Sequence, residues 1–346
     1  LCYKKLNMSK KNSSVILKNS FRDFKDLNKS YLNFKKKLDK IKKKSFLLAI
    51  SGGPDSLALA ALSKAYSYER KVKFYYLMIN HNIRKNSTKE AQQVKSLLKK
   101  NDISLKILTN QKKIDRNIQG QARNIRYEMI SNFCKKNKIN IVLTAHNFED
   151  QVETFFIRLS RGSGLTGLSS MKMMSKLSNN LKLFRPFLDT KKKVLIKISK
   201  IIFKKFIKDP SNQNNFYLRT KIRNLKLPLE KSGINYEQIT KSINNLASSK
   251  ATLDEYYAKI SKEVMIRSRH KITFNLNKFN KYNNEIKIML INDAIKFLKK
   301  NYYNPRAIKV QNLIDSFTKP NCEKMTLGGC FFVKKNDFLT LTSEKS

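Results

Sequence analysis

The feature that most restricts the fold of this chain is a short glycine loop at residues 51–56. The loop lies between an apolar run at 46–50 and an alanine- and leucine-rich segment that begins at Leu57, and it reads Ser51-Gly52-Gly53-Pro54-Asp55-Ser56. A strand, a tight loop and a helix are therefore predicted in this order. Two adjacent glycines let the backbone approach a phosphate closely, and the first N–H groups of a helix point at it. The loop is suited to an anion, although a turn that only caps a helix would use the same residue types.

Strand-like and helical segments alternate around this loop. Apolar strand-like runs occupy 46–50, 73–80, 105–109 and 140–144, and segments with helical spacing of apolar residues lie between them. A lysine-rich amphipathic helix is predicted at 21–42, and Ser87 with Glu90 predicts a capping box at the start of a later helix. The alternation predicts an α/β fold with a parallel twisted sheet and helices on both faces. Ligands of such sheets bind at the carboxyl ends of the strands.

The alternation stops near Pro228, and long polar helical patterns follow. We therefore expect a flexible N-terminal segment at 1–20, a catalytic α/β domain at 21–228 and a smaller, mainly helical domain at 229–346. Near the end, Gly328 and Gly329 predict a tight turn between two edge strands.

The charge of the chain points to a polyanionic partner. Lys and Arg number 73 against 25 Asp and Glu, which gives a formal net charge of +48. Such an excess predicts binding to nucleic acid that weakens as salt rises. The chain is also rich in Lys, Asn and Ile, as a genome biased to A and T would encode, so compositional drift accounts for part of the charge.

Cysteine usage and hydropathy indicate a cytoplasmic protein. The cysteines form no C-x-x-C pair and, with three histidines, no metal-ligand pattern; they are Cys2, Cys134, Cys322 and Cys330. Free thiols fit a reducing cytosol. No apolar run approaches the roughly 18 residues of a membrane span, and the lysine-rich N-terminus lacks an apolar signal core. We expect no membrane partner.

Two further segments carry side chains to the predicted edge of the sheet. His81 follows the second strand and could contact a nucleotide or a phosphate, or only the backbone of its loop. His146 and Asp150 follow the fourth strand and lie four residues apart at the start of a helix. They could hold substrate and a Mg²⁺-bound phosphate. An acid in a first helical turn also simply complements the helix dipole.

The glycine loop resembles the PP-loop of ATP pyrophosphatases, and it lacks the Gly-Lys-Ser/Thr ending of a Walker-type loop. Further segments follow it in a set order: Asn117-Ile118-Gln119, Ala122-Arg123, Arg126-Tyr127, the segment at His146, Arg161-Gly162-Ser163-Gly164-Leu165, Arg185-Pro186-Phe187-Leu188, Asp209-Pro210-Ser211-Asn212 and the run from Tyr217 to Asn224. Their order and spacing between residues 46 and 228 resemble the tRNA(Ile)-lysidine synthetase family.

The resemblance implies a reaction, its cofactors and its partners. Members of this family bind ATP and Mg²⁺ and transfer AMP to the C2 oxygen of the wobble cytidine in the isoleucine tRNA with a CAU anticodon. The amine of L-lysine then displaces AMP and leaves lysidine, so the tRNA pairs with A instead of G and is charged with isoleucine. The resemblance leaves the oligomeric state open.

It also implies roles for residues of this chain. The loop would hold ATP through Ser51, Gly52, Gly53, Pro54, Asp55 and Ser56, with Asp55 near Mg²⁺ or pyrophosphate. His146 and Asp150 match the paired active-site residues of the family. Phosphate charge in the transition state would be neutralised by Arg123 or Arg126 and by Arg219 or Arg223. For each arginine, a contact to the tRNA backbone or a surface ion pair is an open alternative.

Two departures from the family pattern concern tRNA binding. The family's Arg-Asn-Arg-Ile-Arg segment is here Arg219-Thr220-Lys221-Ile222-Arg223, so its middle position keeps the charge and loses the planar guanidinium. Longer family members carry two domains after the catalytic one, whereas only about 120 residues follow Pro228 here.

Three other functions compete with this one. A tRNA cytidine thiolase shares the PP-loop but typically needs clustered cysteines. An amidating PP-loop enzyme that acts on a small metabolite would need an ammonia source and would leave the basic charge unexplained. A basic RNA-binding scaffold with a degenerate nucleotide site would not require the intact loop together with His146 and Asp150.

Overall fold

The computed structural model describes residues 13–84, 86–112, 114, 118–178, 180–207, 216–299, 305–317 and 324–344. It divides into two compact units, unit 1 (Leu1–Asn245) and unit 2 (Leu246–Ser346). The division lies inside helix α11 (Tyr236–Val264), whereas residue 228 lies in helix α10 (Lys226–Lys231). Some segments named above lie outside the described residues: most of the N-terminal segment, Asn117, residues 209–212, Cys2 and Cys322.

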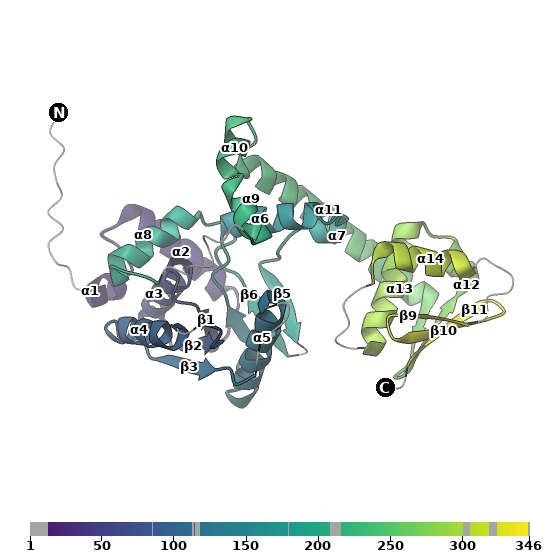
Figure 1. Ribbon diagram of the computed structural model, residues 1–346, viewed down its shortest axis with the longest axis horizontal. Coiled ribbons are helices and arrows are strands. Elements are labelled where there is room, and N and C mark those ends of the chain that lie inside the picture. Colours follow the sequence, from purple (N-terminus) through teal and green to yellow (C-terminus); the bar gives the residue numbers. More distant parts are fainter. Residues whose placement is uncertain are drawn as a thin grey trace. The chain divides into compact units, whose positions relative to one another are not determined.

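Unit 1 is built on a six-stranded sheet with the order β3-β2-β1-β4-β6-β5 (Figure 1). The strands are β1 (Ser45–Ile50), β2 (Lys73–Asn80), β3 (Leu105–Thr109), β4 (Ile141–Leu143), β5 (Met174–Ser178) and β6 (Leu181–Phe184). All neighbouring strands pair in parallel except β5, which is an antiparallel edge strand. The predicted parallel sheet is confirmed. Strands β5 and β6 were not predicted, because they are short and interrupted by lysines.

Helices cover both faces of this sheet, as predicted. One face shares a core with α1 (Ser13–Lys18), α2 (Lys25–Asp39), α3 (Pro54–Glu69), α4 (Ser87–Lys99) and α8 (Lys192–Phe203). The other face packs on α5 (Ile118–Lys136) through Ile130 and Cys134. Residues 57–62 of α3 are all fully buried, because the helix lies between the sheet and its neighbours α1, α2 and α8. A rigid helix thus follows the glycine loop.

The predicted capping box of α4 is wrong. The helix begins at Ser87 itself, and Asn86 occupies the N-cap position. The Ser87 hydroxyl donates to the carbonyl oxygen of Arg84 over 2.8 Å, and Glu90 forms an ion pair with the Arg84 guanidinium at 3.0 Å. Ser87 is therefore one position too late to cap this helix.

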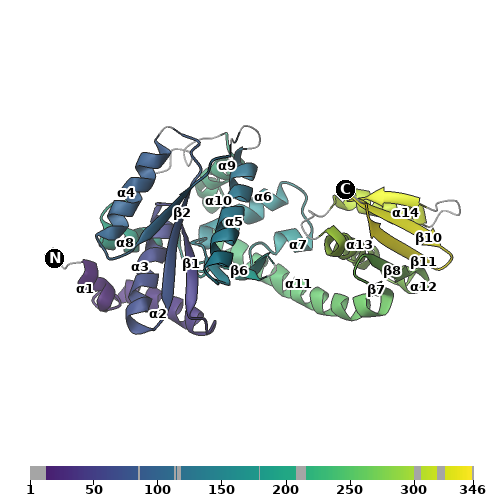
Figure 2. The same cartoon turned by 90° about the horizontal axis from the view of Figure 1, so that it is seen from below.

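A third group of unit 1 helices packs together through its own apolar core. It consists of α6 (Phe148–Leu159), α7 (Leu165–Leu168), α9 (Leu218–Asn224), α10 and the first turns of α11 (Figures 1 and 2). The core contains Phe148 and Val152 from α6 and Tyr236, Ile239 and Ile243 from α11. Because α6 starts where strand β4 ends, this group carries side chains to the carboxyl edge of the sheet.

Unit 2 combines the expected helices with a five-stranded antiparallel sheet that was not predicted. Its helices are the end of α11, α12 (Leu276–Asn280), α13 (Asn284–Lys299) and α14 (Ala307–Phe317). Its strands are β7 (Met265–Arg267), β8 (Lys271–Asn275), β9 (Lys324–Leu327), β10 (Cys330–Lys335) and β11 (Phe338–Ser343), in the order β7-β8-β11-β10-β9. Gly328 and Gly329 form the turn between β9 and β10, both at positive φ. Of these two strands, only β9 lies at an edge of the sheet, so the predicted turn is correct and the prediction that β10 is an edge strand is wrong.

Among the described residues, no helix combines the length and the apolar character that crossing a membrane requires.

Candidate active site

The glycine loop has the predicted geometry between β1 and α3. Gly53 is the N-cap of α3 in an extended conformation, and Pro54 takes the first helical position, where a missing N–H costs nothing. The Ser56 hydroxyl accepts from the Ser51 N–H at 3.2 Å and donates to the carbonyl oxygen of Gly53 at 3.0 Å. The loop is thus closed by its own side chain, and the N–H groups in the first turn of α3 could bind an anion.

Gly52 is required at its position for two reasons. Its φ of +84° is unfavourable for other residues, and a Cβ there would lie 2.6 Å from Val94 Cγ2. We expect Gly52→Ala to lower the free energy of unfolding by about 1–3 kcal/mol and to abolish ATP binding. Gly164 offers a matched control, because it has negative φ and open space around it. Thermal melts and ATP titrations should show a loss for Gly52→Ala alone; equal effects of both substitutions would contradict this account.

Asp55, in the first turn of α3, has a carboxylate oxygen that none of the described residues hydrogen-bonds. Its Oδ1 atom is buried and has no partner among the described residues. Burial raises the pKa of Asp55 to about 7, and the charged groups that act on it are Lys192, Asp150, Glu149 and Arg223. These side chains come from α8, α6 and α9. Charged side chains from three other helices of unit 1 therefore lie within electrostatic range of Asp55.

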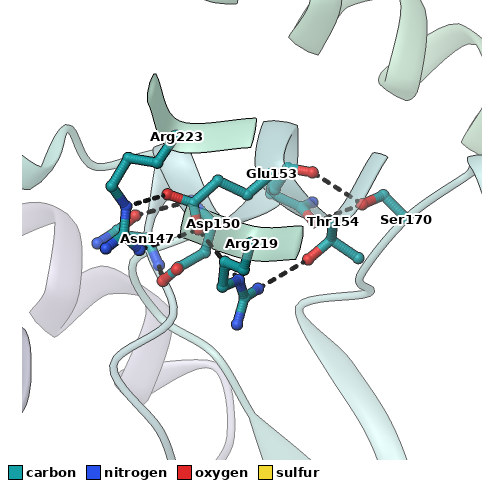
Figure 3. A network of polar contacts seen from close by, with 8 residues as sticks. Asn147, Asp150, Glu153, Thr154, Ser170, Arg219 and Arg223 are labelled. Atoms are coloured by element: carbon teal, nitrogen blue, oxygen red, sulfur yellow. Dashed lines mark hydrogen bonds and ion pairs between the residues drawn. The ribbon is translucent and has the colours of Figure 1, made fainter. Parts of the chain in front are cut away.

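His146 and Asp150 lie at the start of α6. Asn147 is the N-cap: its Oδ1 accepts from the Asp150 N–H, and Asp150 Oδ2 accepts from the Asn147 N–H, each over 3.0 Å (Figure 3). One oxygen of Asp150 is thus used in a capping box. His146 Nδ1 lies 2.9 Å from Thr144 Oγ1. Burial lowers the pKa of His146 to about 4, while the Asp150 carboxylate opposes this shift. The imidazole is neutral at pH 7, and none of the hydrogen bonds of the described residues uses its other nitrogen, which could bind a ligand.

Glu153, one turn further along α6, holds both predicted arginines of α9. Its side chain is only 3% exposed. Its two oxygens accept from Arg223 Nε at 2.8 Å and Nη2 at 3.1 Å, and Arg219 Nε lies 3.0 Å from Oε2 (Figure 3). Arg219 also donates to the Thr154 hydroxyl over 3.2 Å. Lys221, between them, points to solvent.

The pairing with Glu153 brings Arg223 to the acids of the site. Glu153 holds the pKa of the Arg223 guanidinium above its usual range, and Asp150 and Asp55 act in the same direction. Arg219 acts on His146 from the same helix α9. Glu153 was not predicted as a site residue, although its spacing of three residues from Asp150 places both on one face of α6.

Two more side chains fix α6 in place. The Glu149 carboxylate accepts from the backbone N–H of Lys192 over 2.8 Å and so caps the start of α8. The Gln151 carboxamide binds both backbone groups of Met171, each over 2.9 Å. These contacts make α6 a rigid support for His146, Asp150 and Glu153.

Arg126 contacts His81 and, in contrast to Arg219 and Arg223, does not pair with Glu153. Its guanidinium contacts His81 Nε2 over 3.4 Å at the end of strand β2. Burial and this guanidinium lower the pKa of His81 to about 4. A cavity of about 260 Å³ lies there, lined by residues 81–83, 110–112 and Ile114. Of the two predicted alternatives on α5, Arg123 is the one whose charge acts on His146.

The described residues contain no group of three or more His, Cys, Asp or Glu side chains that could hold a metal ion. The unpartnered Asp55 oxygen nevertheless fits one carboxylate ligand of a Mg²⁺ ion whose remaining ligands are phosphate oxygens and water. Asp55 and its surroundings therefore fit a metal ion that binds together with a nucleotide.

Comparisons with known proteins agree with this geometry. Residues 26–230 match the PP-loop domain family. A tRNA(Ile)-lysidine synthase of Wolbachia pipientis wMel is 33% identical over 307 residues, which cover 86% of this chain and 70% of that protein. The synthase of Orientia tsutsugamushi (strain Boryong) is 42% identical over 181 residues, which cover 51% of this chain and 40% of that protein.

Among solved structures, a U34-tRNA thiolase of Methanococcus maripaludis has a TM-score of 0.54 at 18% identity, covering 64% of this chain and 78% of the thiolase. This likeness concerns the fold alone. The PP-loop match spans more than half of the chain, and the match to the Wolbachia synthase covers most of it and extends into both units. The chain belongs to the tRNA(Ile)-lysidine synthase family of PP-loop proteins.

Proposed function

We propose that this protein ligates L-lysine to C2 of the wobble cytidine in the isoleucine tRNA with a CAU anticodon, through an adenylated tRNA. The observation that carries the proposal is that Arg223, which is paired with the buried Glu153 carboxylate, lies within electrostatic range of Asp150 and of Asp55 in the PP-loop. Family membership supports the choice of substrates, and this group of charges supports the place of the chemistry.

In the first step, the cytidine C2 oxygen attacks the α-phosphorus of ATP, and pyrophosphate leaves. The PP-loop N–H groups bind the leaving phosphates. Arg223 is fixed by a buried carboxylate, so its charge is already in position when negative charge develops, and no reorganisation is needed. Bound Mg²⁺ would neutralise phosphate charge at Asp55.

In the second step, the lysine amine attacks C2, and AMP leaves with the former C2 oxygen. Adenylation turns that oxygen into a good leaving group, and the amine must be neutral to attack. The carboxylates of Asp150 and Asp55 can take up its proton. His146 is neutral at pH 7 and can donate or accept a hydrogen bond without bringing a charge near the amine.

The net charge of +48 supports a tRNA partner, because Lys and Arg side chains displace counterions from a phosphate backbone. The test is to incubate the protein with ATP, Mg²⁺ and the CAU-anticodon isoleucine tRNA, with and without lysine. We expect lysine-dependent AMP release and a nucleoside with the mass of lysidine. AMP release without any change in nucleoside mass, or an unmodified cytidine after turnover, would contradict the proposal.

A cysteine-free variant separates this function from thiolation. Cys134 and Cys330 are buried and free, and burial raises the pKa of the Cys134 thiol to about 12, so it is unreactive. We expect replacement of all four cysteines by alanine to change the lysine-ligation rate by less than about threefold, with the small stability loss of truncated core side chains. A rate that falls to background while the fold is kept would favour sulfur chemistry.

A further inference from the structure

The sheet of unit 2 has one face covered by helices and one face that no described core residue covers. The covered face carries alternate residues of the strands, Ile272, Phe274, Cys330, Phe332, Leu339 and Leu341, and they pack with α11 to α14 in one core. The residues between them on each strand point to the opposite face.

This opposite face has an unusual composition. Strand pairing aligns Lys271, Thr342, Phe331 and Thr326 in one row across β8, β11, β10 and β9. The next row contains Thr273, Thr340, Val333 and Lys324, and Lys335 lies opposite Phe338. The same row continues to the exposed Ile266 of β7, opposite Thr273. The face therefore offers hydroxyls, lysines, two phenylalanines and the aliphatic Val333 and Ile266. Phe338 is 47% exposed.

The described residues of this face include no acid. The strands β7 to β11 contain no Asp or Glu, and three of their lysines lie on this face: Lys271, Lys324 and Lys335. The nearest acids along the chain, Glu323, Asp337 and Glu344, lie beyond the strand ends. The Lys324 ammonium lies 4.6 Å from the centre of the Phe331 ring. An aromatic ring with an adjacent cation is able to stack on a base and bind its phosphate at the same time.

We propose that this face, defined by Phe331, Lys324, Lys271 and the neighbouring threonines, binds unpaired nucleotides of the tRNA. Bases stack on aromatic side chains of open sheets, and Lys and Thr side chains contact the backbone without reading sequence. A protein partner fits less well, because the face combines hydroxyls and cations with few large apolar groups. The inference rests on the proposed function for its choice of RNA, and it names a role for the C-terminal part of the chain.

The test compares Phe331→Ala and Lys324→Gln in the full chain with Phe297→Ala. Phe297 is a matched control, because it is 41% exposed and also has a cation, Arg267, 5.8 Å from its ring, but it lies on α13. We expect Phe331→Ala to weaken binding of the CAU-anticodon tRNA roughly tenfold. Lys324→Gln should make the slope of log affinity against log salt concentration shallower by about one released counterion. Phe331→Tyr should restore affinity. Phe297→Ala should bind as wild type.

Ultraviolet crosslinking provides a second readout that does not depend on a variant folding. A crosslinked peptide from residues 324–335 supports the proposal. The proposal is overturned if a folded Phe331→Ala variant binds tRNA with unchanged affinity, or if Phe297→Ala loses as much tRNA affinity as Phe331→Ala. It is also overturned if Phe331→Ala changes the oligomeric mass without changing the tRNA affinity. If the wild type binds tRNA through Phe331 but forms no lysidine, the proposed reaction is refuted and the proposed tRNA-binding surface is supported.

Discussion

Replacing Asp55 with asparagine is expected to lower ATP-dependent adenylation of the tRNA by roughly a thousandfold. Asparagine has almost the same shape but no negative charge to hold Mg²⁺ beside the leaving phosphates. Pyrophosphate release in the presence of tRNA is the direct measurement. Binding of tRNA should stay within about twofold, because that affinity comes from many lysines and arginines spread along the chain. A collapse of tRNA affinity would show that the loop has a structural role instead.

The same substitution should stabilise the free protein at high pH. Burial raises the pKa of Asp55 to about 7, above the ~3.9 of an unfolded chain. The folded state binds this proton more tightly, so the contribution of Asp55 to stability falls as the pH rises from about 4 to about 7. Asparagine does not titrate. We therefore expect Asp55→Asn to melt above the wild type at pH 8 without ATP and Mg²⁺, and to lose this advantage at pH 4; the opposite order would contradict the burial of Asp55.

Replacing Arg223 with glutamine is the second large effect. We expect adenylation to fall by about a hundredfold to a thousandfold, since a fixed donor to developing charge is removed. The free energy of unfolding should also fall by about 1–3 kcal/mol, because the buried Glu153 carboxylate loses its bidentate partner. Arg70→Gln is the control: its pair with Asp39 at 3.4 Å lies on the surface at the end of α3, so neither stability nor activity should change measurably.

A double substitution separates the two roles of Arg223. In Glu153→Gln with Arg223→Gln, no carboxylate is left buried without Arg223, and Arg219 is partly exposed and keeps its hydrogen bond to Thr154, so most of the lost stability should return. Adenylation should remain as slow as in Arg223→Gln alone, because the cation is still missing. If activity returned together with stability, Arg223 would act only by satisfying Glu153, and its role at the phosphates would be refuted.

The sequence predicted the parts of the fold whose signal is local. Strands β2 and β3 have the predicted bounds, and the glycine loop follows β1. The conformation of an apolar run or a glycine turn depends mainly on its own residues, so it can be predicted locally. Strands β5 and β6 and the sheet of unit 2 were missed. They are short strands with outward-facing lysines and threonines, and only pairing with distant partners makes them strands.

The same contrast holds for the site. Asp55, His146 and Asp150 stand next to a strand end or a helix start, so their position could be predicted from nearby residues. Glu153 could not, because its role depends on α9, about 70 residues away along the chain, packing against α6. Arg126 was grouped with the phosphate-binding arginines, and its contact in the structure is His81, which only the sheet order brings near.

The central claim is that the C2 oxygen of the wobble cytidine is the nucleophile that takes AMP from ATP. It is tested most directly with a CAU-anticodon isoleucine tRNA that carries ¹⁸O at C2 of this cytidine, incubated with the protein, ATP, Mg²⁺ and lysine. The mass of the released AMP is then measured. The account predicts one ¹⁸O atom in each AMP and none in pyrophosphate. Unlabelled AMP formed together with lysidine would contradict it.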